Sequence, residues 1–331
     1  LSNLKDLKET SSLVASKTWP GWYYTASDRV KPENDPQGQD DYSICTPLGT
    51  VTARNNCRMT ERAKIWMVHM ASNAAAPNYR YIDQVRAFPI SNAAWAYNVN
   101  IAFNGDWEDM SQGPVRTVGG VSSNTILIAA TGKDTGNGNC NSRRVIEFNE
   151  LNPYSAAGTT WSPTYVYDLN GATISPHQSD CNIEAMWLDF VGTTPYAYMS
   201  NYGTTNAGAT WLGNKVFRRV LTTTTGRAAS TGFNSGTPIT PSASEFSLVG
   251  NLSTSGGKTY QLSGAGFQES NDDLVMISSN SSQGGGCQLL MWHSRSYATT
   301  TNPNEYGSCA GVSGTTAEGI SYVYSTDPDV K

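Results

Sequence analysis

The chain has 331 residues, of which 38% are hydrophobic and only 15% are charged, and its formal net charge is −5 at pH 7. This composition is adequate to bury a core. No run of basic residues is longer than a pair such as Arg143–Arg144, so the sequence lacks the basic patch of a protein that binds nucleic acid or an anionic membrane. Since no apolar run approaches the roughly 18 residues of a membrane span, we expect no insertion into a membrane.

The first third of the chain alternates strand-like runs with loops. Residues 11–16 and 21–27 are rich in β-branched and aromatic side chains, which is typical of strands. An insertion over residues 29–61 follows. Residues 60–75 form the only stretch with a helical pattern of apolar residues, although residues 64–70 (KIWMVHM) could equally form a strand.

Strand-like runs dominate the rest of the chain. Residues 104–113 (NGDWEDMSQG) carry three carboxylates around one tryptophan, directly before a run that reads as the start of a strand. Further runs, bounded by Gly, Asn, Asp or Pro, span residues 124–132, 143–150, 163–169, 184–190, 195–203, 214–221, 244–250, 273–281, 287–296 and 319–325. Many short strands predict an all-β sandwich, barrel or propeller.

The six cysteines lie in three separated pairs, and no CxxC motif suggests a zinc or redox site. Their order predicts the disulfides Cys45–Cys57, Cys140–Cys181 and Cys287–Cys309, with free buried thiols as the alternative. N-glycosylation sequons begin at Asn251 and Asn280. Together with the low charge content, these features favour a secreted, extracellular glycoprotein. The polar opening LSNLKDLKET is not a signal peptide, so we expect the processed form of the protein.

A weak internal repeat favours one of the all-β architectures. Five segments share a polar or acidic start, then a small or acidic residue, then a large apolar residue that opens a strand. These apolar residues are Leu13, Met110, Met186, Phe267 and Ile320. A four-stranded blade needs about 40–50 residues, so each interval has room for one blade with its loops. The sequence therefore predicts a single β-propeller domain over residues 1–331 with five blades, and the long first interval leaves room for a sixth.

Several of these segments resemble the landmarks of a known group of proteins. They are ETSSLVASKTWPGWYYTASD, NGDWEDMSQGP, TGKDTGNGNCNSRRVIEFNE, HQSDCNIEAMWLDF, LSGAGFQES and AEGISY. In this order they resemble secreted bacterial propeller proteins that carry an Asp-Trp-Glu-Asp motif, over residues 9–324. Because that group has no settled activity, the resemblance implies a propeller fold and no particular function. The insertion, the cysteines and the sequons depart from the group's pattern, and the chain ends where a fuller last blade would be expected.

Acidic residues recur at one phase of the repeat. Glu108, Glu184 and Glu318 hold matching positions, and Ser11 and Ala265 stand in the other two segments. In a propeller these positions converge near the axis, where like charges repel. A hard cation such as Ca²⁺ would offset the repulsion, with oxygen ligands from Asp106, Glu108, Asp109, Asp180, Asn182 and Glu184. Alternatively, the acids accept backbone N–H bonds that tie neighbouring blades together, and no cofactor is required.

Aromatic residues are abundant, with 17 Tyr and 9 Trp. This is more than a small β core requires, so we expect some of them at the surface, where Tyr and Trp serve sugar stacking or protein interfaces. Residues 19–24 (WPGWYY) form the densest patch, and burial between blades is the other interpretation of this patch.

Two functions follow from these features. The first is a secreted module without catalysis, which binds an extracellular protein, a glycan or copies of itself. The second is a carbohydrate-active enzyme, a polysaccharide lyase or a glycoside hydrolase, in which Glu108 and Glu184 form an acid pair and His177 lies near the axial mouth. The sequence has no nucleophile elbow, phosphate loop, dinucleotide fingerprint or His-Glu-x-x-His motif. It therefore favours the first function.

Overall fold

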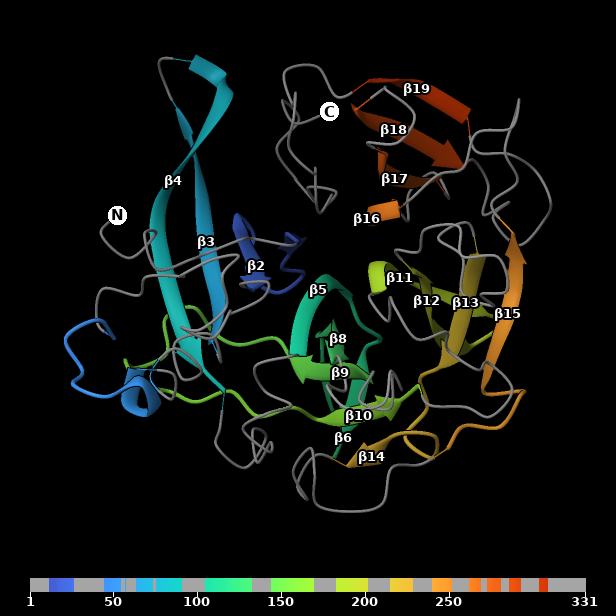
Figure 1. Cartoon of the computed structure of the whole chain (residues 1–331), viewed down its shortest axis with the longest axis horizontal. Helices are drawn as coiled ribbons and strands as arrows, with labels where there is room; N and C mark the ends of the chain where they lie inside the picture. Colours follow the sequence, from blue (N-terminus) through green and yellow to red (C-terminus); the bar gives the residue numbers. More distant parts are fainter. Residues whose placement is uncertain are drawn as a thin grey trace.

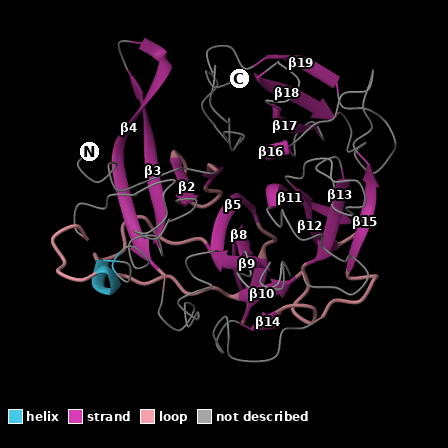
Figure 2. Cartoon of the chain, in the orientation of Figure 1, coloured by secondary structure: helices cyan, strands magenta, loops and turns pink. Residues whose placement is uncertain are grey.

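The computed structural model describes residues 12–26, 45–54, 57, 64–73, 76–90, 105–132, 144–169, 183–201, 215–228, 240–251, 262–268, 273–280, 286–292 and 304–308. These residues are mostly strand, with a short helical turn at residues 51–54 (Figure 2). No helix among them is long and apolar enough to span a membrane.

The strands form four antiparallel sheets and one separate hairpin. Sheet 1 contains β1 (Val14–Ala15), β2 (Trp22–Ala26), β3 (Lys64–Asn73) and β4 (Ala76–Pro89). Sheet 2 contains β5 (Gly105–Gln112), β8 (Thr125–Gly132), β9 (Arg144–Asn149), β10 (Tyr165–Asp168) and β14 (Arg227–Ala228). Sheet 3 contains β11 (Ile183–Val191), β12 (Thr194–Asn201), β13 (Lys215–Val220) and β15 (Phe246–Asn251). Sheet 4 contains β16 (Leu262–Gln268), β17 (Asp273–Asn280), β18 (Gly286–Trp292) and β19 (Asn304–Ser308). The hairpin is β6 (Arg116–Val118) with β7 (Val121–Ser123).

The four sheets follow one another around a common centre, with β5, β11 and β16 at the inner ends of their sheets (Figure 1). β11 lies beside both β5 and β16, and β1 lies beside β5. The chain completes each sheet before it begins the next, with one exception. β14 follows β13 of sheet 3 in the chain, but it pairs with β10 at the outer edge of sheet 2.

Three hydrophobic cores lie between consecutive sheets, and β8 shows how one strand supplies two of them. Ile126 and Ile128 pack in the core between sheets 1 and 2, whereas Leu127 and Ala129 pack in the core between sheets 2 and 3. Successive side chains of a strand point to opposite faces. A strand with a sheet on each side is therefore apolar at nearly every position, which explains the continuous apolar runs in the sequence.

The helical interpretation of residues 60–75 is wrong. These residues contain β3, which pairs with β2 on one edge and with β4 on the other. The alternation within KIWMVHM explains the strand, because Ile65 and Met67 enter the core between sheets 1 and 2 while Val68 packs in a separate cluster with Ala15. The predicted strands at residues 11–16 and 21–27 are confirmed, as are those between residues 124 and 296.

The Cys45–Cys57 disulfide is confirmed, and it lies between β2 and β3 in the chain. Cys140, Cys181 and Cys309 lie outside the described residues, and the side chain of Cys287 on β18 is not described. Both remaining disulfides therefore stay predictions. The sequon residues Asn251 and Asn280 are the last residues of β15 and β17.

Candidate functional site

The acidic segment forms β5, and its ladder with β8 contains an irregularity at Glu108. Trp107 pairs with Ala130 and Asp109 pairs with Ala129, so Glu108 is the extra residue of a β-bulge. In β11, Ile183 pairs with Asn201 and Ala185 pairs with Ser200, which leaves Glu184 as the extra residue there. The two glutamates thus hold the same place in sheets 2 and 3, in agreement with the repeat.

The ladder of sheet 4 corrects the sequence alignment of the fourth repeat. Leu262 pairs with Ser278 and Gly264 pairs with Ile277, so the extra residue is Ser263. Ser263, and not Ala265, therefore corresponds to Glu108. Ala265 takes the place that Met110 and Met186 hold in sheets 2 and 3. The sequence pattern misplaces this repeat because the pattern looks for a large apolar residue at the position of Met110 and Met186. In sheet 4 that position holds the small residue Ala265, which packs in the core that contains Trp187.

Asp109 connects sheet 2 to sheet 3. Its side chain is only 1% exposed. Oδ1 accepts a hydrogen bond from the backbone N–H of Met110 at 2.8 Å, and Oδ2 accepts one from the backbone N–H of Met186 at 2.5 Å. Met186 belongs to β11, the inner strand of sheet 3, and no other strand of the described residues pairs with the inner edge of β11. Asp109 therefore satisfies a backbone donor that the sheet leaves unpaired, which is the second of the two roles considered for the acids.

Gln112, at the end of the same strand, reaches the opposite neighbour. Its Nε2 donates a hydrogen bond to the backbone carbonyl of Ala15 on β1 at 2.7 Å. The inner strand of sheet 2 thus binds the inner strands of both adjacent sheets through two side chains, Asp109 toward sheet 3 and Gln112 toward sheet 1. Both contacts involve backbone groups, so they depend on the positions of the strands and not on the identity of the partner residue.

The other sequence-predicted site residues fall into two groups. Asp106 and Glu108 lie on β5 and Glu184 lies on β11, and their side chains are not described. Ser11, His177, Asp180, Asn182 and Glu318 lie outside the described residues. Within the described part of the chain, no group of three or more His, Cys, Asp or Glu side chains is arranged to hold a metal ion.

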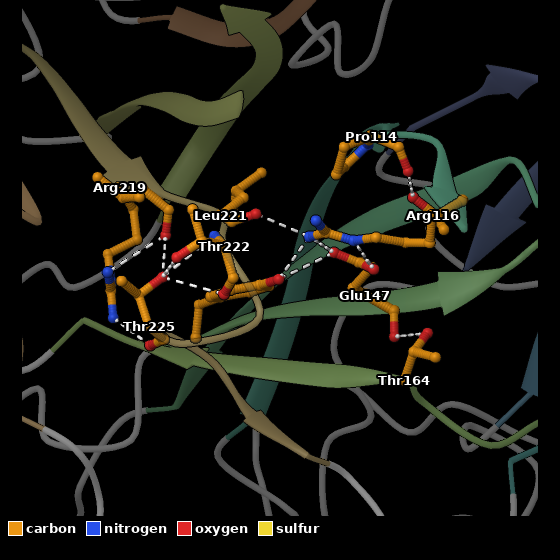
Figure 3. Close-up of polar contacts among 11 residues, drawn as sticks. Pro114, Arg116, Glu147, Thr164, Arg219, Leu221, Thr222 and Thr225 are labelled. Atoms are coloured by element: carbon orange, nitrogen blue, oxygen red, sulfur yellow. Dashed lines mark hydrogen bonds and ion pairs between the residues drawn. The ribbon is translucent and has the colours of Figure 1, made fainter. Parts of the chain in front are cut away.

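A buried ion pair at the root of the β6–β7 hairpin was not anticipated from the sequence (Figure 3). Glu147 on β9 is fully buried, and Arg116 on β6 donates to it in a bidentate arrangement, Nε to Oε1 at 2.8 Å and Nη2 to Oε2 at 2.6 Å. Nη2 also lies 2.7 Å from the hydroxyl of Tyr167 and 2.8 Å from the carbonyl oxygen of Leu221. The last contact joins the hairpin to the segment that directly follows β13 of sheet 3.

These neighbours shift the pKa values of Arg116 and Tyr167. Burial disfavours the charged guanidinium, but the hydrogen bonds and the negative charge of Glu147 outweigh burial and raise the pKa of Arg116. Burial, followed by the negative charge of Glu147, raises the pKa of Tyr167. Arg116 therefore keeps its positive charge beside Glu147, and Tyr167 keeps its proton, which it donates to Glu147 Oε2 at 3.0 Å.

A second buried cluster surrounds Asp168 on β10. Arg227 donates to both carboxylate oxygens, Nε to Oδ2 at 2.6 Å and Nη2 to Oδ1 at 2.8 Å, and Arg144 Nε donates to Oδ1 at 3.2 Å. Arg219 of sheet 3 donates from Nε to the backbone carbonyl of Asp168 at 3.1 Å and from Nη2 to that of Thr225 at 2.8 Å. Burial lowers the pKa of Arg219. This cluster explains why β14 joins sheet 2, because Arg227 lies on it.

The buried acids Asp109, Glu147 and Asp168 therefore act as structural partners. General acid–base catalysis needs a carboxyl group within reach of a substrate in a cleft. Asp109 accepts two backbone N–H bonds, while Glu147 and Asp168 each accept from arginines. The sequence does carry a signal for these pairs, since Glu147 interrupts the apolar run VIEF and Asp168 interrupts the apolar run YVYDL. A charge in a buried strand requires a partner, but the sequence does not show which residue supplies it.

No protein-family profile matches the chain, and no curated protein matches it. Among solved structures, the crystal structure of an exo-1,5-α-L-arabinanase from a bovine ruminal metagenomic library is similar, with 10% sequence identity and a TM-score of 0.29. The match covers 86% of this chain and 92% of that chain. Similarity at this level assigns neither a fold family nor an activity.

Proposed function

We propose that the protein is a secreted β-propeller that acts as a binding or assembly module without catalysis. The observation that carries this proposal is the set of hydrogen bonds that Asp109 accepts. Asp109 is the one described carboxylate of the acidic motif, and both of its oxygens bind backbone N–H groups within and between sheets. An acid used in this way holds sheets together and is not available to a substrate.

The arrangement of the sheets supports the propeller. Four consecutive antiparallel meanders surround one centre with their first strands innermost (Figure 1), which is the arrangement of propeller blades. The proposal of five blades rests on the sequence repeat at Ile320, which lies outside the described residues. Between Leu13 and β5, all the described strands belong to sheet 1, in which β3 and β4 are long.

The experiment compares Glu108→Gln, Glu184→Gln and the unchanged protein for thermal unfolding and for release of reducing ends or unsaturated sugars from polysaccharides. We expect no turnover by any of the three proteins, and a lower melting temperature for the variants if the glutamates tie the sheets together. Turnover by the unchanged protein, lost in a variant that melts at the same temperature, would establish the carbohydrate-active enzyme instead. Melting with added Ca²⁺ or EDTA tests the cation shell in the same samples, because an ion that binds only the folded state raises the melting temperature.

A further inference from the structure

An exposed aromatic cluster lies where sheets 1 and 2 meet. Tyr154, in the loop between β9 and β10, is 63% exposed. Its ring lies at 79° to that of Trp19, with centroids 6.0 Å apart, and at 86° to that of Trp22, with centroids 5.9 Å apart. Trp22 is buried, whereas Trp19 is partly buried. The rings of Trp19 and Trp22 are each nearly perpendicular to the Tyr154 ring and pack against it, while most of Tyr154 stays open to solvent.

The backbone on either side of Tyr154 is fixed by hydrogen bonds. Asn152 Oδ1 accepts from the N–H of Tyr154 at 2.8 Å, and the carbonyl of Asn152 accepts from the N–H of Ser155 at 3.0 Å. Arg86 on β4 donates from Nε to the carbonyl of Pro153 at 3.0 Å. The ring is therefore held in place before any ligand arrives, which lowers the entropy cost of binding.

The loop that carries Trp19 is fixed in a similar way. Ser16 Oγ accepts from the N–H of Trp19 at 2.9 Å. Glu150 accepts from Ser16 Oγ at 2.7 Å and from the backbone N–H groups of Lys17 and Thr18 at 2.8 and 2.9 Å. Glu150 directly precedes the Tyr154 loop, so one carboxylate joins the two segments that present the aromatic rings.

The groups around the rings are polar and balanced in charge. Arg86 is exposed, and among the described residues only its Nε has a hydrogen-bond partner. Asp83 is paired with His69, whose Nδ1 lies 2.6 Å from Asp83 Oδ1. The two positive charges of Lys17 and Arg86 balance the two negative charges of Glu150 and Asp83. This balance gives no preference for a polyanionic or a polycationic ligand.

We propose that the Tyr154 ring, held at its side by Trp19, forms a platform for a sugar ring of a neutral polysaccharide, with Arg86 as a donor to the sugar hydroxyl groups. The face of an aromatic ring carries partial negative charge, and the C–H groups of a sugar ring present a weakly positive, apolar face to it. The planar guanidinium supplies several donors in fixed directions. The inference rests on the proposed function in one respect, namely that the bound sugar is not cleaved.

The surroundings of Tyr154 favour a sugar over a protein partner. A stable protein interface covers about 800 Å² on each side and has an apolar centre. The loop around Tyr154 instead exposes Asn152, Ala156, Ala157, Gly158 and Thr160, which are small or polar. A single exposed aromatic ring among such residues is large enough to stack one sugar unit.

The experiment is native electrophoresis of the full chain in gels cast with xylan, glucomannan, hydroxyethylcellulose or polygalacturonate. We expect retardation by at least one neutral polymer. Tyr154→Ala should weaken it about fivefold to a hundredfold, as expected when one aromatic stacking partner of a ring is lost. Tyr154→Phe should retain most of the binding, because it keeps the ring face. Val118→Ser, an exposed apolar residue of the β6–β7 hairpin, serves as the matched control and should bind as the unchanged protein does.

Three results would overturn the platform. They are no retardation by any neutral polymer, retardation by polygalacturonate alone, and retardation that Tyr154→Ala and Trp19→Ala leave unchanged while their melting temperatures show folded protein. Analysis of the recovered polymer separates this inference from the proposed function. Binding with cleavage keeps the platform and contradicts a module without catalysis, whereas neither binding nor cleavage contradicts only the platform.

Discussion

At the scale of single residues, the interior of this protein contains charged side chains that bulk composition does not suggest. Glu147, Asp168 and Asp109 are all buried, and each accepts hydrogen bonds from groups distant in sequence. Removing a carboxylate from water is costly unless several donors replace the lost hydration. Each of these acids has at least two such donors, so the energetic role of the pairs is tested by removing one donor or acceptor at a time.

Asp109→Asn should lower the free energy of unfolding by about 1–3 kcal/mol, the cost of leaving a buried polar group without its partner. An asparagine keeps one acceptor oxygen and places an N–H donor opposite the backbone N–H of either Met110 or Met186. Denaturant unfolding of the full chain measures the change. Asp83→Asn is the matched control, because this exposed acid pairs with His69 at the surface, where such pairs contribute about 0–1 kcal/mol. Equal losses in both variants would show that the contact between β5 and β11 is unimportant.

Glu147→Gln and Arg116→Met should each cost about 3–5 kcal/mol, because each leaves the other charge buried without its partner. The pair is almost fully shielded, with side-chain exposures of 12% for Arg116 and 0% for Glu147. The double variant should cost less than the sum of the two single changes, since it leaves neither charge alone. A double-mutant cycle measured by denaturant unfolding tests this. Strictly additive losses would mean that the two side chains do not interact.

At the scale of elements, the glycine at the turn into β14 determines how this strand reaches sheet 2. Gly226 directly precedes Arg227, and a Cβ atom at this position would lie 2.6 Å from Cε1 of the buried Tyr167. Tyr167 cannot move freely, because its hydroxyl binds Glu147 and lies close to Arg116. The turn therefore requires a residue without a side chain, for reasons of space and not of backbone conformation.

Gly226→Ala should destabilise the protein by about 1–3 kcal/mol, the usual cost of an extra group in a packed core. Gly49→Ala should leave stability nearly unchanged, because no atom lies within 4 Å of the Cβ position there. Melting temperatures of the two variants and the unchanged protein provide the measurement. If Gly226→Ala melts like Gly49→Ala, β14 does not pack against Tyr167 as described.

The sequence predicts some elements much better than others. β8, β9, β11 and β12 are found from their apolar runs, because both faces of these strands are buried. β4 is missed because it is the outer strand of sheet 1, where exposed residues such as Asp83 and Gln84 remove the apolar pattern. The β6–β7 hairpin did carry a signal. Gly119 and Gly120 have φ values of 58° and 81°, as the two-residue turn of a hairpin requires, and valines flank them.

At the scale of the whole molecule, contacts between sheets join residues that are far apart in sequence. Asp109 of sheet 2 and Met186 of sheet 3 are 77 residues apart, Arg219 of sheet 3 and Asp168 of sheet 2 are 51 apart, and Arg116 of the hairpin and Leu221 are 105 apart. The repeat in the sequence predicts that consecutive sheets are neighbours, but not which faces meet or which side chains cross between them. The order of the sheets was therefore predictable, whereas the buried ion pairs and the aromatic platform follow only from how the sheets pack.

Two buried tyrosines at these interfaces make the stability of the whole molecule sensitive to alkaline pH. Tyr24 lies in the core between sheets 1 and 2, and Tyr167 lies in the core between sheets 2 and 3. Burial, followed by the negative charge of Glu150, raises the pKa of Tyr24 far above its usual value of 10.0. Burial, followed by the charge of Glu147, raises the pKa of Tyr167 in the same way. Both tyrosines therefore remain neutral in the folded protein at pH values where exposed tyrosines ionise.

Stability should consequently fall as the pH rises above about 10. In the unfolded chain both tyrosines lose their protons above this pH, whereas the folded protein keeps them. The unfolded state therefore binds fewer protons, and ionisation lowers its free energy relative to the folded state. Below that pH both states hold these protons, and the contribution of the two tyrosines is constant. Denaturant unfolding across this pH range, combined with the ultraviolet absorbance of tyrosinate, measures both effects. Tyr24→Phe and Tyr167→Phe should each make the alkaline loss of stability less steep, whereas ionisation of every tyrosine in the still folded protein would contradict the buried positions of these two rings.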